Sequence, residues 1–272
     1  MSPVDVRRFA ISEGVTVPCV EGQELSRVLS ALDDFRQHVC ARAPDVSAAF
    51  EVQLLTTLRE LVADAAAVPR LGEIPSDLDD LQRACVHYSL LLLGRSGTEG
   101  VQGSEVDRRD AYRANLYPTF FRFRVLREVM GRNAAIPFIR DYIDARIRRL
   151  TLANPALEDV DLFWDVLHDP DFESPTSGIA GRFHRGKIAF RIDRCLLHEL
   201  TEPLGDPEVS FLVCCYGDTA NVEATNPNFV YTCPMTLVEG DPYCDKCLHD
   251  RRFVDAVEHP PRAFYDALDV GQ

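Results

Sequence analysis

The chain has 272 residues, of which 46% are hydrophobic and 26% are charged, and this composition is typical of a globular protein with one large domain or two modest ones. Its formal net charge of −14 argues against a nucleic-acid or anionic-membrane partner, because either would require a basic face on the protein. Nine cysteines and an N-terminus without a secretory signal predict a reducing, cytoplasmic location with mostly free thiols.

Apolar residues recur at helical spacing through most of the first 150 residues. The sequence predicts an irregular or short-strand arm over 1–22, helices over 23–41, around 54–62, over 76–93, 119–130 and 134–150, and a Gly- and Ser-rich loop over 96–106. We therefore expect residues 1–150 to form a mainly helical region.

The pattern changes after Asn154-Pro155. Alternation predicts one or two strands within 178–192, with a turn at Arg185-Gly186. Helices are predicted over 195–204 and over 207–224 with Asp206 as a cap, and a hairpin is predicted from 228–237 and 243–250. Residues 151–272 are therefore expected to form an α+β region. The predicted fold class is α+β, with a helical N-terminal half packed on a C-terminal antiparallel sheet with helices.

Cysteines are concentrated in the last third of the chain, since six of the nine lie between Cys195 and Cys247. Thiols are nucleophiles and soft metal ligands, so this is where we expect chemistry to occur. Cys215 and Asp218 lie three residues apart in a predicted helix, as do Cys195 and His198, and this spacing places each pair on neighbouring parts of a helix surface.

The predicted strand at 243–250 divides its side chains between two faces. Alternation places Cys244 and Lys246 on one face and Asp245 and Cys247 on the other, so Cys244 and Asp245 cannot both enter one pocket unless a bulge intervenes. We favour Cys244 as the site residue. The CxxC formed by Cys244 and Cys247 is a weak zinc signal, because strong sites contain two such pairs.

Several ordered elements carry a family resemblance over roughly residues 183–250. They are Arg194-Cys195, Cys215 with Asp218, Asn226-Pro227, Thr232 with Thr236, Gly240-Asp241 and Cys244-Asp245. This stretch resembles the L-2-amino-thiazoline-4-carboxylic acid hydrolase family. Lys246 stands where the resemblance leads us to expect an aromatic residue, and Cys214, Cys233, Cys247 and His198 are additions to the pattern.

The resemblance implies hydrolysis of a C–N or C–S bond in a small heterocycle or amidine, a reaction that also suits natural-product metabolism. The ring carbon between N and S is an electrophile that a thiolate or an activated water could attack, with an acid to protonate the departing atom. The predicted catalytic residues are Cys215, Asp218, Cys244, Cys195 and His198, and the predicted substrate-binding residues are Asp245, Thr232, Thr236 and Asn221.

Two other classes of function stay open at this point. The hairpin is also similar to 4-vinyl-reductase-type small-molecule-binding domains, which would bind a ligand without turnover. A zinc-binding structural domain is the third hypothesis, with Cys244 and Cys247 among its ligands. We predict a small-molecule partner and no cofactor, with zinc as the alternative; nucleic acid and membrane are not predicted, and a homodimer stays open.

Overall fold

The computed structural model describes residues 5–19, 21–63, 77–94, 104–155, 157, 163–164, 167, 173–184 and 186–268. These residues form two compact units. One unit comprises residues 14–142, and the other comprises residues 1–13 together with 143–272. Most of the loop predicted over 96–106 lies outside the described residues, but its last part, from Ser104, belongs to a strand.

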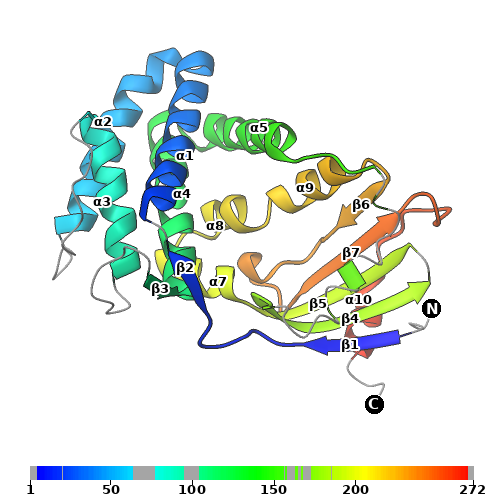
Figure 1. The fold of residues 1–272 in the computed structure, drawn as a ribbon. Coiled ribbons are helices and arrows are strands. Elements are labelled where there is room, and N and C mark those ends of the chain that lie inside the picture. Colours follow the sequence, from blue (N-terminus) through cyan, green and yellow to red (C-terminus); the bar gives the residue numbers. More distant parts are fainter. Residues whose placement is uncertain are drawn as a thin grey trace. The chain divides into compact units, whose positions relative to one another are not determined.

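Helices dominate the unit formed by residues 14–142 (Figure 1). The helices are α1 (Glu21–Arg42), α2 (Pro44–Ala63), α3 (Asp80–Gly94), α4 (Arg108–Met130) and the first part of α5 (Arg132–Leu150), and two strands, β2 (Thr16–Cys19) and β3 (Ser104–Asp107), pair beside them. At the centre of this unit, the Phe35 ring contacts the rings of Phe50 at 5.6 Å and Tyr142 at 4.8 Å between centroids.

Helix α4 begins eleven residues earlier than the predicted Thr119, at Arg108. The reason is its cap: the Asp107 carboxylate accepts a hydrogen bond from the Arg109 N–H at 2.7 Å and so satisfies a backbone donor of the first turn. Pro118 lies inside the helix without ending it.

The second unit is built on a five-stranded antiparallel sheet with the order β1-β4-β5-β7-β6. Its strands are β1 (Asp5–Phe9), β4 (Thr176–His184), β5 (Lys187–Cys195), β6 (Phe229–Thr232) and β7 (Cys244–Asp250). Its shorter helices are α7 (Leu196–Thr201), η1 (Glu202–Leu204), α8 (Pro207–Cys214), α9 (Gly217–Thr225), η2 (Leu237–Glu239) and α10 (Arg262–Ala267). Helices and an antiparallel sheet together confirm the predicted α+β class.

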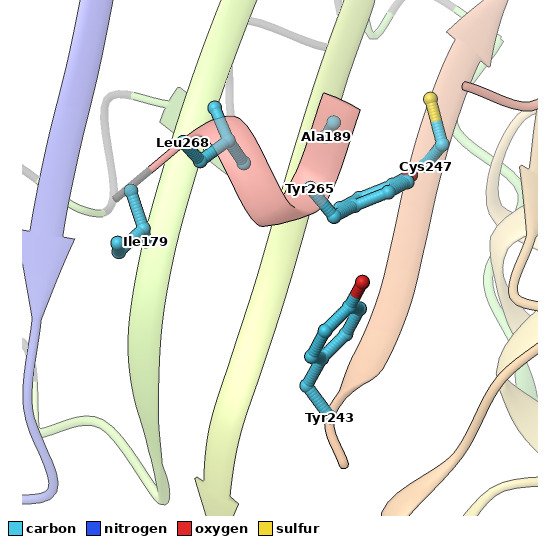
Figure 2. Packing of buried hydrophobic residues seen from close by; sticks show 6 residues of the cluster. All are labelled: Ile179, Ala189, Tyr243, Cys247, Tyr265 and Leu268. Atoms are coloured by element: carbon cyan, nitrogen blue, oxygen red, sulfur yellow. The ribbon is translucent and has the colours of Figure 1, made fainter. Parts of the chain in front are cut away.

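The two faces of this sheet are covered by different elements. On one face, which we call the far face, Tyr265 of α10 and the adjacent Leu268 pack on Ala189 and Cys247, and Figure 2 shows Tyr265 extending toward Cys247. The opposite face, the near face, carries Ile188 and Leu248 in a cluster with Trp164 and Val222 of α9. Because side chains alternate along a strand, neighbouring residues of β7 belong to different environments.

The helix predicted over 207–224 is two helices. Asp206 caps the first, as predicted, by accepting from the Val209 N–H at 3.2 Å, but α8 ends at Cys214. The N–H groups of both Cys215 and Tyr216 then donate to the carbonyl of Phe211 at 2.9 Å, so the helical register is lost at this point. Consequently Cys215 and Asp218 do not share a helix, and the predicted spacing argument for that pair is wrong.

Two further predicted elements are shorter than expected. Cys195 is the last residue of β5 and precedes α7, so Cys195 and His198 do not occupy one helix either. The strand predicted over 228–237 ends at Thr232, and a 3-10 turn begins at Leu237 after the Thr236 cap. The intervening segment contains Pro234, which has no N–H to continue a sheet ladder.

Candidate active site

A cavity of about 750 Å³ lies on the near face of the sheet, within the unit of residues 1–13 and 143–272. Helix α9 and the α8–α9 junction form one side, and strands β6 and β7 form the other. The lining residues are Asp144, Arg148, Phe211, Cys215, Tyr216, Asp218, Thr219, Ala220, Glu223, Ala224, Pro227, Phe229, Tyr231, Cys233, Thr236, Cys244, Lys246 and Arg251.

Three thiols line this cavity, each from a different element. Cys215 follows α8, Cys233 follows β6, and Cys244 begins β7. Of the predicted site residues, Asp218 and Thr236 also line it. The cavity therefore brings together polar and thiol side chains from distant positions in the sequence, between Asp144 and Arg251.

Within the polar lining, one carboxylate binds both a lysine ammonium and a tyrosine hydroxyl. The Lys246 ammonium lies 2.9 Å from the Asp218 carboxylate, and the Tyr231 hydroxyl donates to the same carboxylate oxygen at 3.2 Å. Burial opposes the charge on Lys246, but the Asp218 carboxylate outweighs this effect and holds the pKa of Lys246 above its ordinary value. Lys246 therefore stays cationic at neutral pH.

Burial keeps the three thiols of the cavity protonated. It raises the pKa of Cys233 to about 12, and it raises the pKa of Cys215 further above the ordinary value. Burial also raises the pKa of Cys244, although the hydrogen bond from the Leu237 N–H to its sulfur, at 3.3 Å, acts in the opposite direction. Such a donor stabilises a thiolate, which distinguishes Cys244 as the sulfur with a preformed anion contact.

Charged side chains also lie around the edge of the cavity. Arg148 of α5 and Arg251, just after β7, are exposed and line it. The Tyr216 hydroxyl, which also belongs to the lining, donates to Asp144 at 3.3 Å. Either arginine is suited to binding a carboxylate, because guanidinium groups bind carboxylates through paired hydrogen bonds.

Other predicted catalytic residues lie outside the lining of this cavity. Cys195 pairs with Thr176 at the end of β5 and is half-buried. His198 lies on α7, and its Nδ1 atom is buried without a hydrogen-bond partner among the described residues. The predicted substrate-binding residue Asn221 lies on α9, within hydrogen-bond distance of Thr151 at 3.2 Å, and lines a second cavity described below.

Asp245 and Thr232, both predicted to bind substrate, meet on the far face instead. Asp245 Oδ2 lies 3.1 Å from His259 Nε2, and His259 Nδ1 lies 2.8 Å from Thr232 Oγ1. Asp245 Oδ1 also accepts from the Met235 N–H at 2.8 Å, and His259 stacks on Tyr265. This network joins β6, β7 and the segment leading to α10. Both residues therefore stabilise the sheet on the face opposite the cavity and do not line the cavity itself.

The alternation predicted for β7 is confirmed by these contacts. Cys244 and Lys246 face the cavity, whereas Asp245 and Cys247 face α10. The two sulfurs of the CxxC consequently point to opposite sides of the sheet, which prevents their binding one zinc ion in this arrangement. In the described part of the chain, no group of three or more His, Cys, Asp or Glu side chains could hold a metal ion.

Sequence reasoning missed the roles of Lys246, Tyr231 and Cys233. Alternation places Lys246 on the same face as Cys244, but the family resemblance marks Lys246 only as a departure from the pattern and gives it no role. The partnership of Lys246 with Asp218 joins residues 28 positions apart, on different elements. No local pattern records such a contact, although an isolated lysine in a buried strand is an unusual residue that could have indicated a paired charge.

The sequence matches the model of a known protein family. A family model described as L-2-amino-thiazoline-4-carboxylic acid hydrolase matches residues 111–248, about half of the chain. The chain belongs to this family. The match begins within α4, well before the resemblance noted at about residue 183, and it includes the cavity residues from Asp144 to Lys246.

The family's name denotes a hydrolase acting on a thiazoline compound. No curated protein and no solved structure matches this chain significantly. Among the described residues, no helix is long and apolar enough to cross a membrane.

Proposed function

We propose that this hydrolase-family chain opens a small heterocyclic acid, by hydrolysing a ring C–N or C–S bond at an amidine-like carbon. The observation that carries the proposal is the Asp218–Lys246 pair, 2.9 Å apart, in a cavity that three thiols also line. A carboxylate beside thiols supplies both a base and a nucleophile at one place.

Arg148 and Arg251 would receive the carboxylate of the substrate, since both are exposed and line the cavity. Holding that group at the edge directs the ring inward, toward Asp218 and the sulfurs. A protonated amidine also brings positive charge close to a thiol, and nearby positive charge lowers a thiol pKa. Substrate binding would thus offset the effect of burial on the cavity thiols.

Cys244 is the proposed nucleophile, because its sulfur already accepts the Leu237 N–H. Asp218 takes the thiol proton as the sulfur bonds to the carbon of the protonated amidine. The bond from that carbon to the ring nitrogen or sulfur then breaks, and Asp218 returns the proton to the departing atom. Water loses a proton to Asp218 and adds to the same carbon, which then carries a hydroxyl. The Cys244 thiolate leaves as this carbon becomes a carbonyl, and it recovers the proton from Asp218 while the hydroxyl proton passes to solvent. One water is consumed for each ring opened.

The test is turnover of 2-amino-thiazoline-4-carboxylic acid by purified variants. Asp218→Asn and Cys244→Ser should each lower kcat at least 100-fold, within the range typical of losing an acid–base group or a nucleophile. Cys195→Ser is the matched control, because this thiol lies outside the cavity lining, and it should retain activity.

The variants also separate the two routes of attack. Loss of activity in Asp218→Asn alone, with Cys244→Ser fully active, would replace the thiol by a water that Asp218 activates. If both variants and the wild type hydrolyse the ring at equal rates, the chemistry does not occur in this cavity.

One observation favours binding without turnover as a second function. All three cavity thiols have raised pKa values, as expected for sulfurs that line a ligand pocket and remain unreactive. In that case the wild type would bind the ring acid with a measurable Kd and release it unchanged.

All nine cysteines lie among the described residues and are free thiols, so we propose a reducing, cytoplasmic location for either activity.

A further inference from the structure

A second cavity, of about 350 Å³, lies on the same face of the sheet. Its apolar lining includes Phe190 and Ile192 of β5, Leu248 of β7 and Val222 of α9. The full lining is Phe9, Phe163, Leu167, Ser174, Pro175, Thr176, Phe190, Ile192, Asp218, Asn221, Val222, Tyr231, Lys246 and Leu248.

The two cavities adjoin each other and have three lining residues in common. Asp218, Tyr231 and Lys246 line both, and these three residues are the ones joined by the ion pair and the phenol hydrogen bond. The proposed acid–base group therefore stands between the thiols on one side and a mainly apolar space on the other.

On both β7 and α9, polar or thiol residues that line the first cavity are followed along the element by an apolar residue that lines the second. Along β7 the near-face residues are Cys244, Lys246 and then Leu248, with about 7 Å between successive members. Along α9, Val222 lies one helical turn beyond Asp218. A ring held at Asp218 would thus be close enough to the second cavity for a short linker to join it to a substituent there.

The size and lining of the second cavity define the group it would accept. An apolar cavity of about 150 Å³ is enough to hold benzene in another protein, so 350 Å³ accommodates a phenyl or branched alkyl group. Its only ionic groups, among the described lining residues, are Asp218 and Lys246, which bind each other. A charged substituent would find no partner there and would lose its hydration.

We infer that the substrate is a heterocyclic acid bearing an aryl or branched-alkyl substituent, which occupies this second cavity while the ring lies against the thiols. The inference rests on the proposed function, since it assigns the ring to the first cavity. It distinguishes this chain from a hydrolase that is specific for the unsubstituted ring, for which the apolar cavity would have no use.

Binding of two saturated rings tests the inference without requiring turnover. Thiazolidine-4-carboxylate and its 5-phenyl derivative lack the amidine carbon, so calorimetry can measure the Kd of each for the intact wild-type chain. The 5-phenyl compound should bind at least tenfold more tightly. In Val222→Phe, which fills the cavity from α9, this preference should fall to less than threefold. Val222→Thr keeps the side-chain shape but replaces one methyl with a hydroxyl, and should lower the preference by a smaller factor.

Each outcome has a distinct meaning. Equal binding of the two compounds to the wild type, or a preference unchanged in both folded variants, overturns the inference and leaves the proposed function standing. If neither compound binds at millimolar concentration, the ring site of the proposed function is itself wrong and the inference falls with it. Circular dichroism of each variant shows whether it folds, and Val222→Thr, a near-isosteric change, provides the test if Val222→Phe does not.

Discussion

His249 makes the stability of the sheet dependent on pH. It is fully buried on the far face of β7, where its register partner on β5 is Lys187, and its Nε2 atom lies 3.3 Å from Thr232 Oγ1. Burial, the Lys187 ammonium and His259 together lower its pKa from 6.5 to about 4. We therefore predict that mild acid destabilises this unit before its carboxylates are titrated.

The sign follows from proton binding in the two states. An unfolded His249 binds a proton below about pH 6.5, whereas the folded one binds it only below about pH 4. Between these values the unfolded state holds more protons, so stability falls as pH falls. At 1.36 kcal/mol for each pKa unit, His249 contributes a loss of about 2 kcal/mol by pH 5 and about 3 kcal/mol by pH 4. Its full contribution to stability is present above pH 6.5.

The assay is urea unfolding at pH 7, 6 and 5, followed by the fluorescence of Trp164. This residue is the chain's single tryptophan and packs with Leu248, next to His249 on β7. His249→Gln keeps an amide within reach of Thr232 but does not titrate. Between pH 7 and pH 5 the wild type should lose about 2 kcal/mol more than the variant. A difference that stays constant within about 0.5 kcal/mol would refute the reasoning, because titrations common to both proteins cancel.

Three more predictions concern the sheet and the cavity. Gly178→Ala should destabilise the protein by more than about 2 kcal/mol in urea unfolding, since an added Cβ would lie 1.9 Å from a β5 carbonyl oxygen; an unchanged midpoint would contradict this packing. A double-mutant cycle of Lys246→Met and Asp218→Asn should give a coupling of about 1 kcal/mol, modest because the two side chains are 28% and 37% exposed, and a coupling of zero would show that the pair does not form. Iodoacetamide at pH 8 should modify the exposed Cys40 well before Cys215, whose pKa burial raises; mass spectrometry showing the reverse order would mean that Cys215 is ionised.

Hydrophobic alternation in the sequence predicted strands of the sheet and the face on which their side chains lie. Alternation over 178–192 predicted one or two strands, and the structure has two there, β4 and β5. Alternation over 243–250 correctly assigned Cys244 and Lys246 to a single face. A side chain's face on a strand is fixed by the backbone, so this information is present in the sequence before any tertiary contact forms.

The predictions that required long-range contacts were less complete. The break between α8 and α9 occurs where Gly217 packs against Ile147, 70 residues earlier, so closely that a Cβ added to the glycine would lie 3.0 Å from the isoleucine side chain. His259 reaches Asp245 from beyond the hairpin, so the far-face network could not be read from a motif. Propensity within 207–224 favours one helix, and tertiary packing overrides it.

The alternation of β7 also has a consequence for how members of this family can diverge. Near-face positions such as Lys246 and Leu248 line the second cavity, whereas far-face positions such as Asp245 and Cys247 contact α10 and the hydrogen-bond network behind the first cavity. Substrate preference can then evolve by exchanging every second residue of one strand while the others preserve the fold. A single-residue insertion before β7 would do the reverse, moving the packing residues into the cavity and the reactive ones into the core.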